Sequence, residues 1–123
     1  MLRLFMTAAA SVALVGAAVG IADAHPALRS ANPPLGGALV KAPSEIRLTF
    51  SEALIARFSG LEVTDQRGRV VIKSNAQLNI PNKRQLVVPL RTHLAAGTYR
   101  VKWHAVSADT HRVNGTYTFR IRT

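Results

Sequence analysis

Two residues near the C-terminal end have side chains that suit a metal ion. Asp109 and His111 stand two apart in the stretch SADTHRVNG, residues 107–115. If the backbone stays extended there, both side chains point to the same face, because alternate residues of a strand share a face. A carboxylate and an imidazole on one face make half of a metal site. Alone, the D-x-H triplet is typical of a surface turn, where polar residues are common.

The other half of the site is predicted at His25. Residues 1–24 have the pattern of a secretory signal, with an early arginine, an apolar run and an Ala-x-Ala motif that ends at Ala24. A transmembrane anchor is the alternative, but the apolar run is shorter than the ~20 residues that a spanning helix needs. We therefore expect export and cleavage after Ala24, which makes His25 the first residue of a mature domain, residues 25–123.

Cleavage would give His25 a second donor. Its free amine and its ring Nδ1 can then close on one ion as a chelate. Pro26 has no backbone N–H, so the peptide nitrogen beside His25 cannot become a further ligand, and the ion must take its other donors elsewhere. With Asp109 and His111 the donors are nitrogens and one oxygen, which suit tetragonal Cu(II), and affinity along the first row peaks at copper. We expect one Cu(II) ion per chain.

The elements that must position these residues are predicted to be strands. Several segments alternate apolar and polar residues or are short apolar runs, which is typical of strands: 45–50, 60–63, 69–73, 85–90, 98–103 and 116–121. Turn signals rich in Asn, Gly, Pro and Asp separate them, and the segment EALIARF, residues 52–58, allows one helical turn. About seven short strands in one domain predict an all-β sandwich or barrel, with Trp103 in its core.

The composition narrows the choice of partners. The formal net charge is +10, but the basic residues are scattered along the sequence without an aromatic-plus-basic motif, so a solvated basic surface is favoured over a nucleic-acid site. There is no cysteine, so no disulfide forms in an oxidising compartment. The two methionines, Met1 and Met6, fall within the predicted signal. The mature domain would then contain no sulfur.

Together these motifs resemble the CopC family of periplasmic copper-binding proteins. The resemblance rests on HPALRSANP at 25–33, APSEIRLTFSEAL at 42–54 and LAAGTYRVKWHAVSADTHRVNGTYTF at 94–119. It implies a cupredoxin-like or Ig-like Greek-key β-sandwich or barrel, and His25, Asp109 and His111 match the Cu(II) ligands of the family. It also implies a periplasmic location and, as partners, a CopD-type membrane copper transporter or other copper-resistance components.

Two further residues are expected near the metal without binding it. Glu52 matches a family position from which a carboxylate could hydrogen-bond the amine or a bound water. His104 is predicted on the strand face opposite Trp103, where an exposed or supporting role is favoured over ligation. His93 precedes a turn and is expected to be solvated.

The chain departs from the family in one respect. Some members bind Cu(I) through a methionine-rich loop, but the corresponding region, residues 61–84, has no methionine. Soft sulfur donors select Cu(I), so we expect a single Cu(II) site and no Cu(I) site.

We therefore expect a monomeric periplasmic carrier or buffer for Cu(II) that is not an enzyme and binds no nucleic acid. Two alternatives remain at this stage. One is a copper-dependent oxidative enzyme with an N-terminal histidine, like the lytic polysaccharide monooxygenases, although one Trp and two Tyr assigned to the core leave little for a flat aromatic substrate surface. The other is a secreted β-sandwich module that binds no metal.

Overall fold

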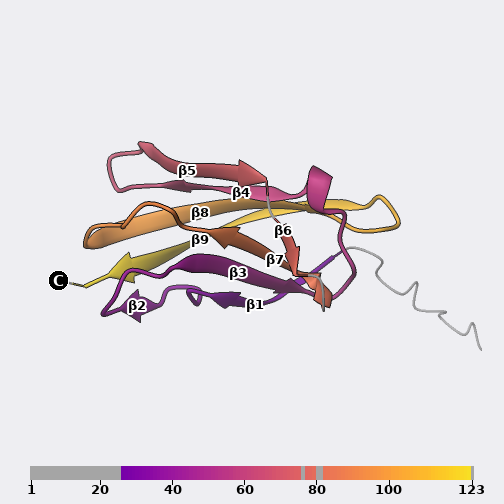
Figure 1. Ribbon diagram of the computed structural model, residues 1–123, viewed down its shortest axis with the longest axis horizontal. Helices are drawn as coiled ribbons and strands as arrows, with labels where there is room; N and C mark the ends of the chain where they lie inside the picture. The colour runs from indigo at the N-terminus through magenta and orange to yellow at the C-terminus, as the bar shows by residue number, and fades with distance from the viewer. Residues whose placement is uncertain (1–25, 76, 80–81, 123) are drawn as a thin grey trace, which may run out of the picture.

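The computed structural model describes residues 26–75, 77–79 and 82–122, which form two packed β-sheets (Figure 1). The predicted signal and His25 lie outside the described residues. The strands are β1 (Leu28–Asn32), β2 (Ala38–Leu39), β3 (Glu45–Phe50), β4 (Gly60–Thr64), β5 (Val70–Asn75), β6 (Gln77–Asn79), β7 (Asn82–Pro89), β8 (Gly97–Val106) and β9 (Arg112–Ile121). A single 3-10 turn, η1 (Ala56–Phe58), precedes β4. In the described ranges no helix has the length and hydropathy needed to cross a membrane.

The two sheets divide the strands without regard to chain order. Sheet A has the order β1-β3-β7-β6, and sheet B has the order β2-β9-β8-β4-β5. The strands pair antiparallel except for β2, which is parallel to β9. The arrangement is a sandwich, as the sequence pattern predicts, and it consists of two separate sheets.

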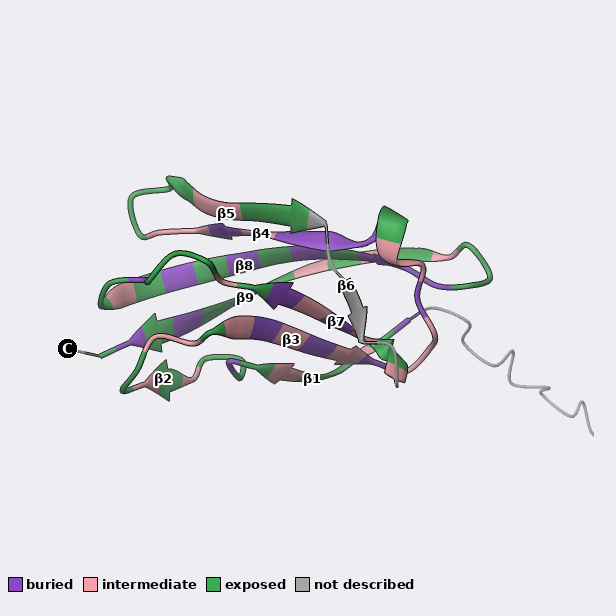
Figure 2. Cartoon of the chain, in the orientation of Figure 1, coloured by how far each residue is buried: buried purple, intermediate pink, exposed green. Residues whose placement is uncertain are grey.

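The hairpin of β8 and β9 is the longest paired element. Its register runs from Gly97 opposite Ile121 to Val106 opposite Arg112 without a bulge. Along both strands the odd-numbered side chains from Tyr99 onward are mostly buried and the even-numbered ones are mostly exposed, which Figure 2 shows as alternating bands. The alternation fixes the register, because a shift by one residue would turn the apolar side chains to solvent.

The core lies between the sheets and is built from these inward side chains. Phe50 of sheet A meets Trp103 of sheet B edge to face, with 5.2 Å between ring centroids and 70° between the ring planes. Such aromatic pairs add to the free energy gained by burying their area. Trp103 is only 7% exposed, which confirms that it belongs to the core.

The structure adds three short strands to those expected. The strand at 45–50 has the predicted bounds, and η1 lies within EALIARF. The sequence does not predict β1, β2 or β6. β1 is a mostly exposed edge strand without alternation, and β2 and β6 have two and three residues, too few for a period to show.

The β8–β9 loop, η1 and the first described residues lie at the same end of the sandwich, on the right in Figure 1. The β4–β5 turn and the last described residues lie at the opposite end. The candidate metal ligands Asp109 and His111 are in the β8–β9 loop, at the same end of the sandwich as the first described residues.

Candidate metal centre

A tight turn shapes the loop between β8 and β9. The amide of Thr110 donates to the carbonyl of Ser107 at 2.8 Å, and the amide of Ser107 donates to the carbonyl of His111 at 2.9 Å. Thr110 has a φ of 73°. A β-branched residue rarely adopts this left-handed conformation, which stores strain and is frequent at functional sites. The loop is therefore held by its own backbone hydrogen bonds.

The turn brings Asp109 and His111 into direct contact. Nδ1 of His111 lies 3.0 Å from Oδ2 of Asp109, and the two side chains are 43% and 49% exposed. The expectation that both side chains share a face is met, but the assumed extended backbone is wrong. The left-handed residue between them, Thr110, reverses the chain and replaces the alternation of a strand as the cause of their proximity.

Ser107 contacts this pair from the buried side of the loop. Its side chain is buried, and its hydroxyl donates a hydrogen bond to Oδ1 of Asp109. The hydrogen bonds from Ser107 and, second, from His111 hold the pKa of the Asp109 carboxyl below its usual range. The carboxylate is thus kept ionised and oriented, as a metal ligand must be. The sequence reasoning gave Ser107 no role, although a serine two residues before an aspartate in a turn is a recognisable hydrogen-bonding pattern.

One segment connects this loop to the start of the described chain. The amide of Ser51 donates to the carbonyl of Ala27 at 2.8 Å, and the amide of Ala27 donates to Oγ of Ser51 at 2.9 Å. Two residues later, the carbonyl of Ala53 accepts the amide of Ala108 at 2.9 Å. Residues 51–53 therefore lie between the first described residues and the loop of Asp109 and His111.

The first residue of this assembly is well anchored. Pro26 is fully buried, and Ala27 is fixed to Ser51 by the two hydrogen bonds just described. His25 precedes Pro26 directly in the sequence and lies outside the described residues. Its proximity to Asp109 and His111 therefore stays a prediction.

The two supporting candidates occupy different places. Glu52 is half-buried and lies between Ser51 and Ala53, in the segment that joins the chain start to the loop. His104 is exposed on β8, where its neighbours across the sheet are Gly60 and Asn114. The alternation puts it on the outer face, opposite Trp103, as expected. Glu52 is therefore the better placed of the two to act on the site.

The described part of the chain contains no complete metal site. Within it, no group of three or more His, Cys, Asp or Glu side chains is arranged to hold a metal ion. The Asp109–His111 pair offers one oxygen and one nitrogen from side chains that are each partly exposed, although the Nδ1 atom of His111 is itself buried. Such a pair can bind a metal only with further donors.

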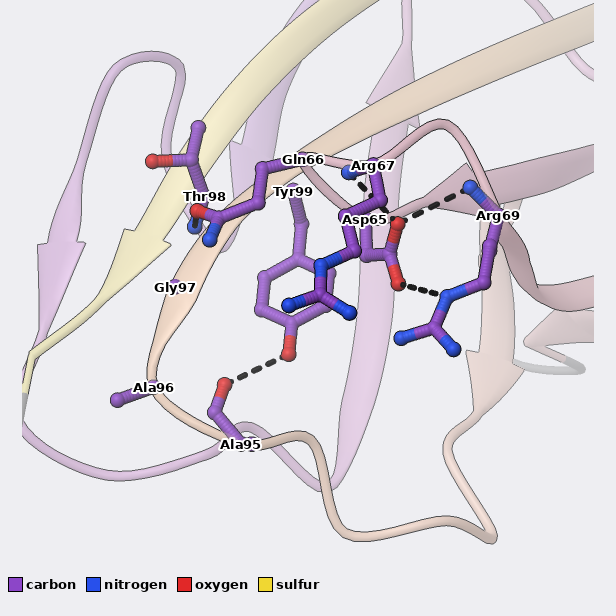
Figure 3. A pocket seen from close by; sticks show the side chains of 9 residues that line it. All are labelled: Asp65, Gln66, Arg67, Arg69, Ala95, Ala96, Gly97, Thr98 and Tyr99. Carbon is purple, nitrogen blue, oxygen red and sulfur yellow. Dashed lines mark hydrogen bonds and ion pairs between the residues drawn. The ribbon is translucent and has the colours of Figure 1, made fainter.

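A second polar site lies at the opposite end of the sandwich, in a pocket of about 260 Å³ (Figure 3). Asp65 there accepts the backbone amides of Arg67 and Arg69 at 2.9 and 3.0 Å and the Nε of Arg69 at 3.1 Å. These hydrogen bonds lower the pKa of the Asp65 carboxyl, and the bond from the Arg69 amide contributes most. The hydroxyl of Tyr99 donates to the carbonyl of Ala95 at 2.6 Å. The Asp65 carboxylate and the Tyr99 hydroxyl are thus used to hold turns together.

Comparison with known proteins gives a consistent result. The family model of the CopC domain matches residues 28–122. The Copper resistance protein C of Escherichia coli is 41% identical over 108 residues, a match that covers 82% of this chain and 84% of that protein.

Two solved structures share the fold. The crystal structure of CopC from Methylosinus trichosporium OB3b superposes with a TM-score of 0.75 at 28% identity and covers 80% of this chain and 94% of that one. That of PcoC, a methionine-rich copper resistance protein from Escherichia coli, superposes with a TM-score of 0.67 at 39% identity and covers 80% of this chain and all of the other.

Proposed function

Because the chain belongs to the CopC family of copper resistance proteins, we propose that it is a periplasmic carrier or buffer that binds one Cu(II) ion. The proposed ligands are the amine and imidazole of His25, the carboxylate of Asp109 and the imidazole of His111. The observation that carries the proposal is the contact between Asp109 and His111 at the end of the sandwich where the described chain begins.

The spacing of this pair suits two ligands of one ion. Donors at about 2.0–2.1 Å from a metal and at right angles to each other lie about 2.9 Å apart. Nδ1 of His111 and Oδ2 of Asp109 are 3.0 Å apart. The two donor atoms are therefore close enough to bind one ion, with a rotation of the side chains that turns both lone pairs toward the metal.

Hydrogen bonds connect the segment that follows His25 to the loop of this pair. Ala27, two residues after His25, is hydrogen-bonded to Ser51, and Ala53 is hydrogen-bonded to Ala108, the neighbour of Asp109. Glu52 lies between these two attachments and is proposed to hydrogen-bond the terminal amine or a water on the metal. His104 is proposed to stay outside the ligand set.

The donor types favour the oxidised metal. PcoC is described as methionine-rich, whereas the two methionines of this chain are Met1 and Met6, ahead of the matched domain. Without thioether sulfur, the proposed site selects Cu(II), and reduction to Cu(I) weakens the hold on the metal. Copper is thus the cargo, and the protein delivers it to a partner, for which a CopD-type membrane transporter is proposed.

The aromatic residues support a carrier over an oxidative enzyme. Trp103, Tyr99 and Tyr117 are each 6–7% exposed and belong to the core. Among the described residues no Trp or Tyr side chain is left to form a flat platform for a polysaccharide.

The decisive experiment compares three forms of the exported protein by Cu(II) titration. The first begins at His25, the second carries one extra glycine ahead of His25, and the third carries one extra glycine after Thr123. We expect tight one-to-one binding by the first and third forms and a large loss of affinity in the second, because only the second turns the amine into an amide. Equal binding by all three would show that the amine is not a ligand.

A further inference from the structure

Basic side chains that are far apart in the sequence lie together on the outer face of sheet B. Residues 100 and 102 of β8 are exposed, and so are residues 112 and 120 of β9. The register places Arg100 opposite Thr118, Lys102 opposite Thr116 and Arg120 opposite Thr98, so their side chains point to one side. We call this surface the basic face: Lys73, Arg100, Lys102, Arg112, Arg120 and Arg122.

Little negative charge offsets the basic face. Glu62 is the one acidic residue on the described outer surface of sheet B, where it faces Lys102 on one side and Lys73 on the other. Of the other described carboxylates, Glu45 pairs with Arg47 in sheet A, Asp109 contacts His111, and Glu52 follows β3. Asp65 lies at the β4–β5 turn, at the edge of the basic face near Arg100, and pairs with Arg69. Among the described residues, no cation of the basic face takes part in an ion pair. The face therefore presents a net positive field to solvent.

The surface between these cations is polar and shallow. Threonines lie opposite Arg100, Lys102 and Arg120 across the pair of β8 and β9, and two open hollows of about 270 and 450 Å³ lie on this surface. The first hollow contains Arg100 together with Asp65, whose carboxylate is paired with Arg69, and the second contains Arg120 and Arg122. Each hollow therefore combines a guanidinium with threonine hydroxyls, which can donate hydrogen bonds to the oxygens of a phosphate group.

The same surface lacks the usual centre of a protein interface. Stable protein interfaces have aromatic or aliphatic anchors at their centre. In the described chain β8 and β9 carry none of the exposed large hydrophobic side chains, which are Leu35, Val40, Phe58 and, at the start of the edge strand β5, Val70. A flat, charged sheet without an apolar centre fits a planar array of phosphates better than it fits another protein.

We propose that the basic face binds the surface of a membrane rich in anionic phospholipid. Each Lys or Arg near such a surface strengthens binding about fivefold, and salt screens the attraction. Asp109 and His111 lie in the loop that joins β8 and β9, at the rim of this face. Binding would hold that loop beside the lipid headgroups. The proposal does not depend on copper.

The test is sedimentation of the exported protein with vesicles of phosphatidylglycerol and phosphatidylcholine, compared with vesicles of phosphatidylcholine alone. One triple variant removes charge from the basic face: Arg100→Gln, Lys102→Gln and Arg120→Gln. The matched control removes the same charge from exposed positions of sheet A: Arg29→Gln, Lys83→Gln and Arg84→Gln. Both variants have the same net charge, so only the place of the charge differs.

We expect the unaltered protein to bind anionic vesicles and not neutral ones, with binding that weakens as salt is raised. The basic-face variant should bind at least twentyfold more weakly, and the control less than fivefold more weakly. Equal losses in the two variants would assign binding to net charge alone and overturn the proposal. No binding to anionic vesicles would also overturn it and would leave an acidic protein as the occupant of this face. A Cu(II) titration of each variant tests the metal site separately.

Discussion

The buried hydroxyl of Ser107 donates a hydrogen bond to Oδ1 of Asp109 while Nδ1 of His111 lies 3.0 Å from Oδ2 of the same carboxylate. Both oxygens of Asp109 are therefore engaged, and the carboxylate cannot rotate without losing a partner. The buried Ser107 thus helps to fix the orientation of the Asp109 carboxylate, a proposed copper ligand.

Replacing Ser107 by alanine should weaken copper binding without removing any ligand. Outer partners of metal ligands typically account for about 10–100-fold in affinity, and we expect a loss in that range. The pKa of Asp109 should rise toward its ordinary value, because the Ser107 hydrogen bond, which lowers this pKa most, is gone. Cu(II) titration measures the affinity, and NMR titration of the metal-free variant measures the pKa.

A matched control for this variant is Thr116→Ala, an exposed hydroxyl on β9 away from the loop. It should bind copper as the unaltered protein does. If Ser107→Ala leaves both the affinity and the Asp109 pKa unchanged, the serine is only a packing residue.

Copper affinity should fall on acidification because of the nitrogen ligands and not because of Asp109. The lowered pKa of Asp109 keeps its carboxylate ionised when the pH falls from neutral to about 5. An amine and imidazoles must lose protons to bind a metal, so protons compete with copper over this range. Titrations from pH 7.5 to 5.5 should show a steep decline in the protein that begins at His25.

The form with an extra glycine ahead of His25 provides the comparison for this pH dependence. It lacks the terminal amine at the histidine, so its weaker binding should depend less steeply on pH. Affinity that stays level across this range in the unextended protein would argue against amine ligation.

Gly115 should not tolerate a side chain. A Cβ at this position would lie 2.5 Å from Cζ2 and 2.8 Å from Cε2 of Trp103, its neighbour across the hairpin. Overpacking of this kind typically costs about 1–3 kcal/mol, so Gly115→Ala should lower the free energy of unfolding by that amount. Urea unfolding followed by far-UV circular dichroism measures the change, because this signal remains when Trp103, the one tryptophan of the chain, is replaced. Combining it with Trp103→Phe should cost less than the sum of the two single changes, and simple additivity would contradict the contact.

Tyr117 should limit stability at high pH. Burial raises the pKa of its phenol to about 12, from an ordinary value of 10.0. The folded protein therefore retains the phenolic proton more strongly than the unfolded chain does. The resulting stability is complete below pH 10 and is lost as the pH rises through about 12.

Unfolding in urea at pH 8 and at pH 11.5 tests this expectation. Tyr117→Phe should lose less stability between the two pH values than the unaltered protein. Some loss should remain, because burial also raises the pKa of Tyr99. The same loss in both proteins would mean that Tyr117 does not titrate with unfolding.

The sequence predicts the elements that have a strong period. The strand from Glu45 to Phe50 and the parts 98–103 and 116–121 of the long hairpin follow directly from alternation, because their inner face is buried. The hairpin extends beyond the predicted parts to Val106 and back to Arg112, where the inner side chains of β9 are only half-buried. The short strands β1, β2 and β6 are held by pairing with longer neighbours, which no local pattern records.

The candidate site was predictable in part for a similar reason. Residue types alone identify Asp109 and His111, but the left-handed Thr110 that brings them together depends on the whole turn. The support from Ser107 depends on its burial. The basic face could not be read from the sequence, since its residues are scattered along the chain and only strand pairing gathers them.

Residues 51–53 are hydrogen-bonded both to the first described residues and to the loop of Asp109 and His111, at separate positions. The first described residues are attached to the fold through the edge strand β1 and the Ala27–Ser51 hydrogen bonds, whereas Asp109 and His111 belong to a loop with backbone hydrogen bonds of its own. Fraying of the edge strand would withdraw His25, the proposed chelating residue, while the other two donors stayed in place. An acceptor protein could then take copper by stepwise ligand exchange, entering one coordination position at a time, without the ion ever being free in solution.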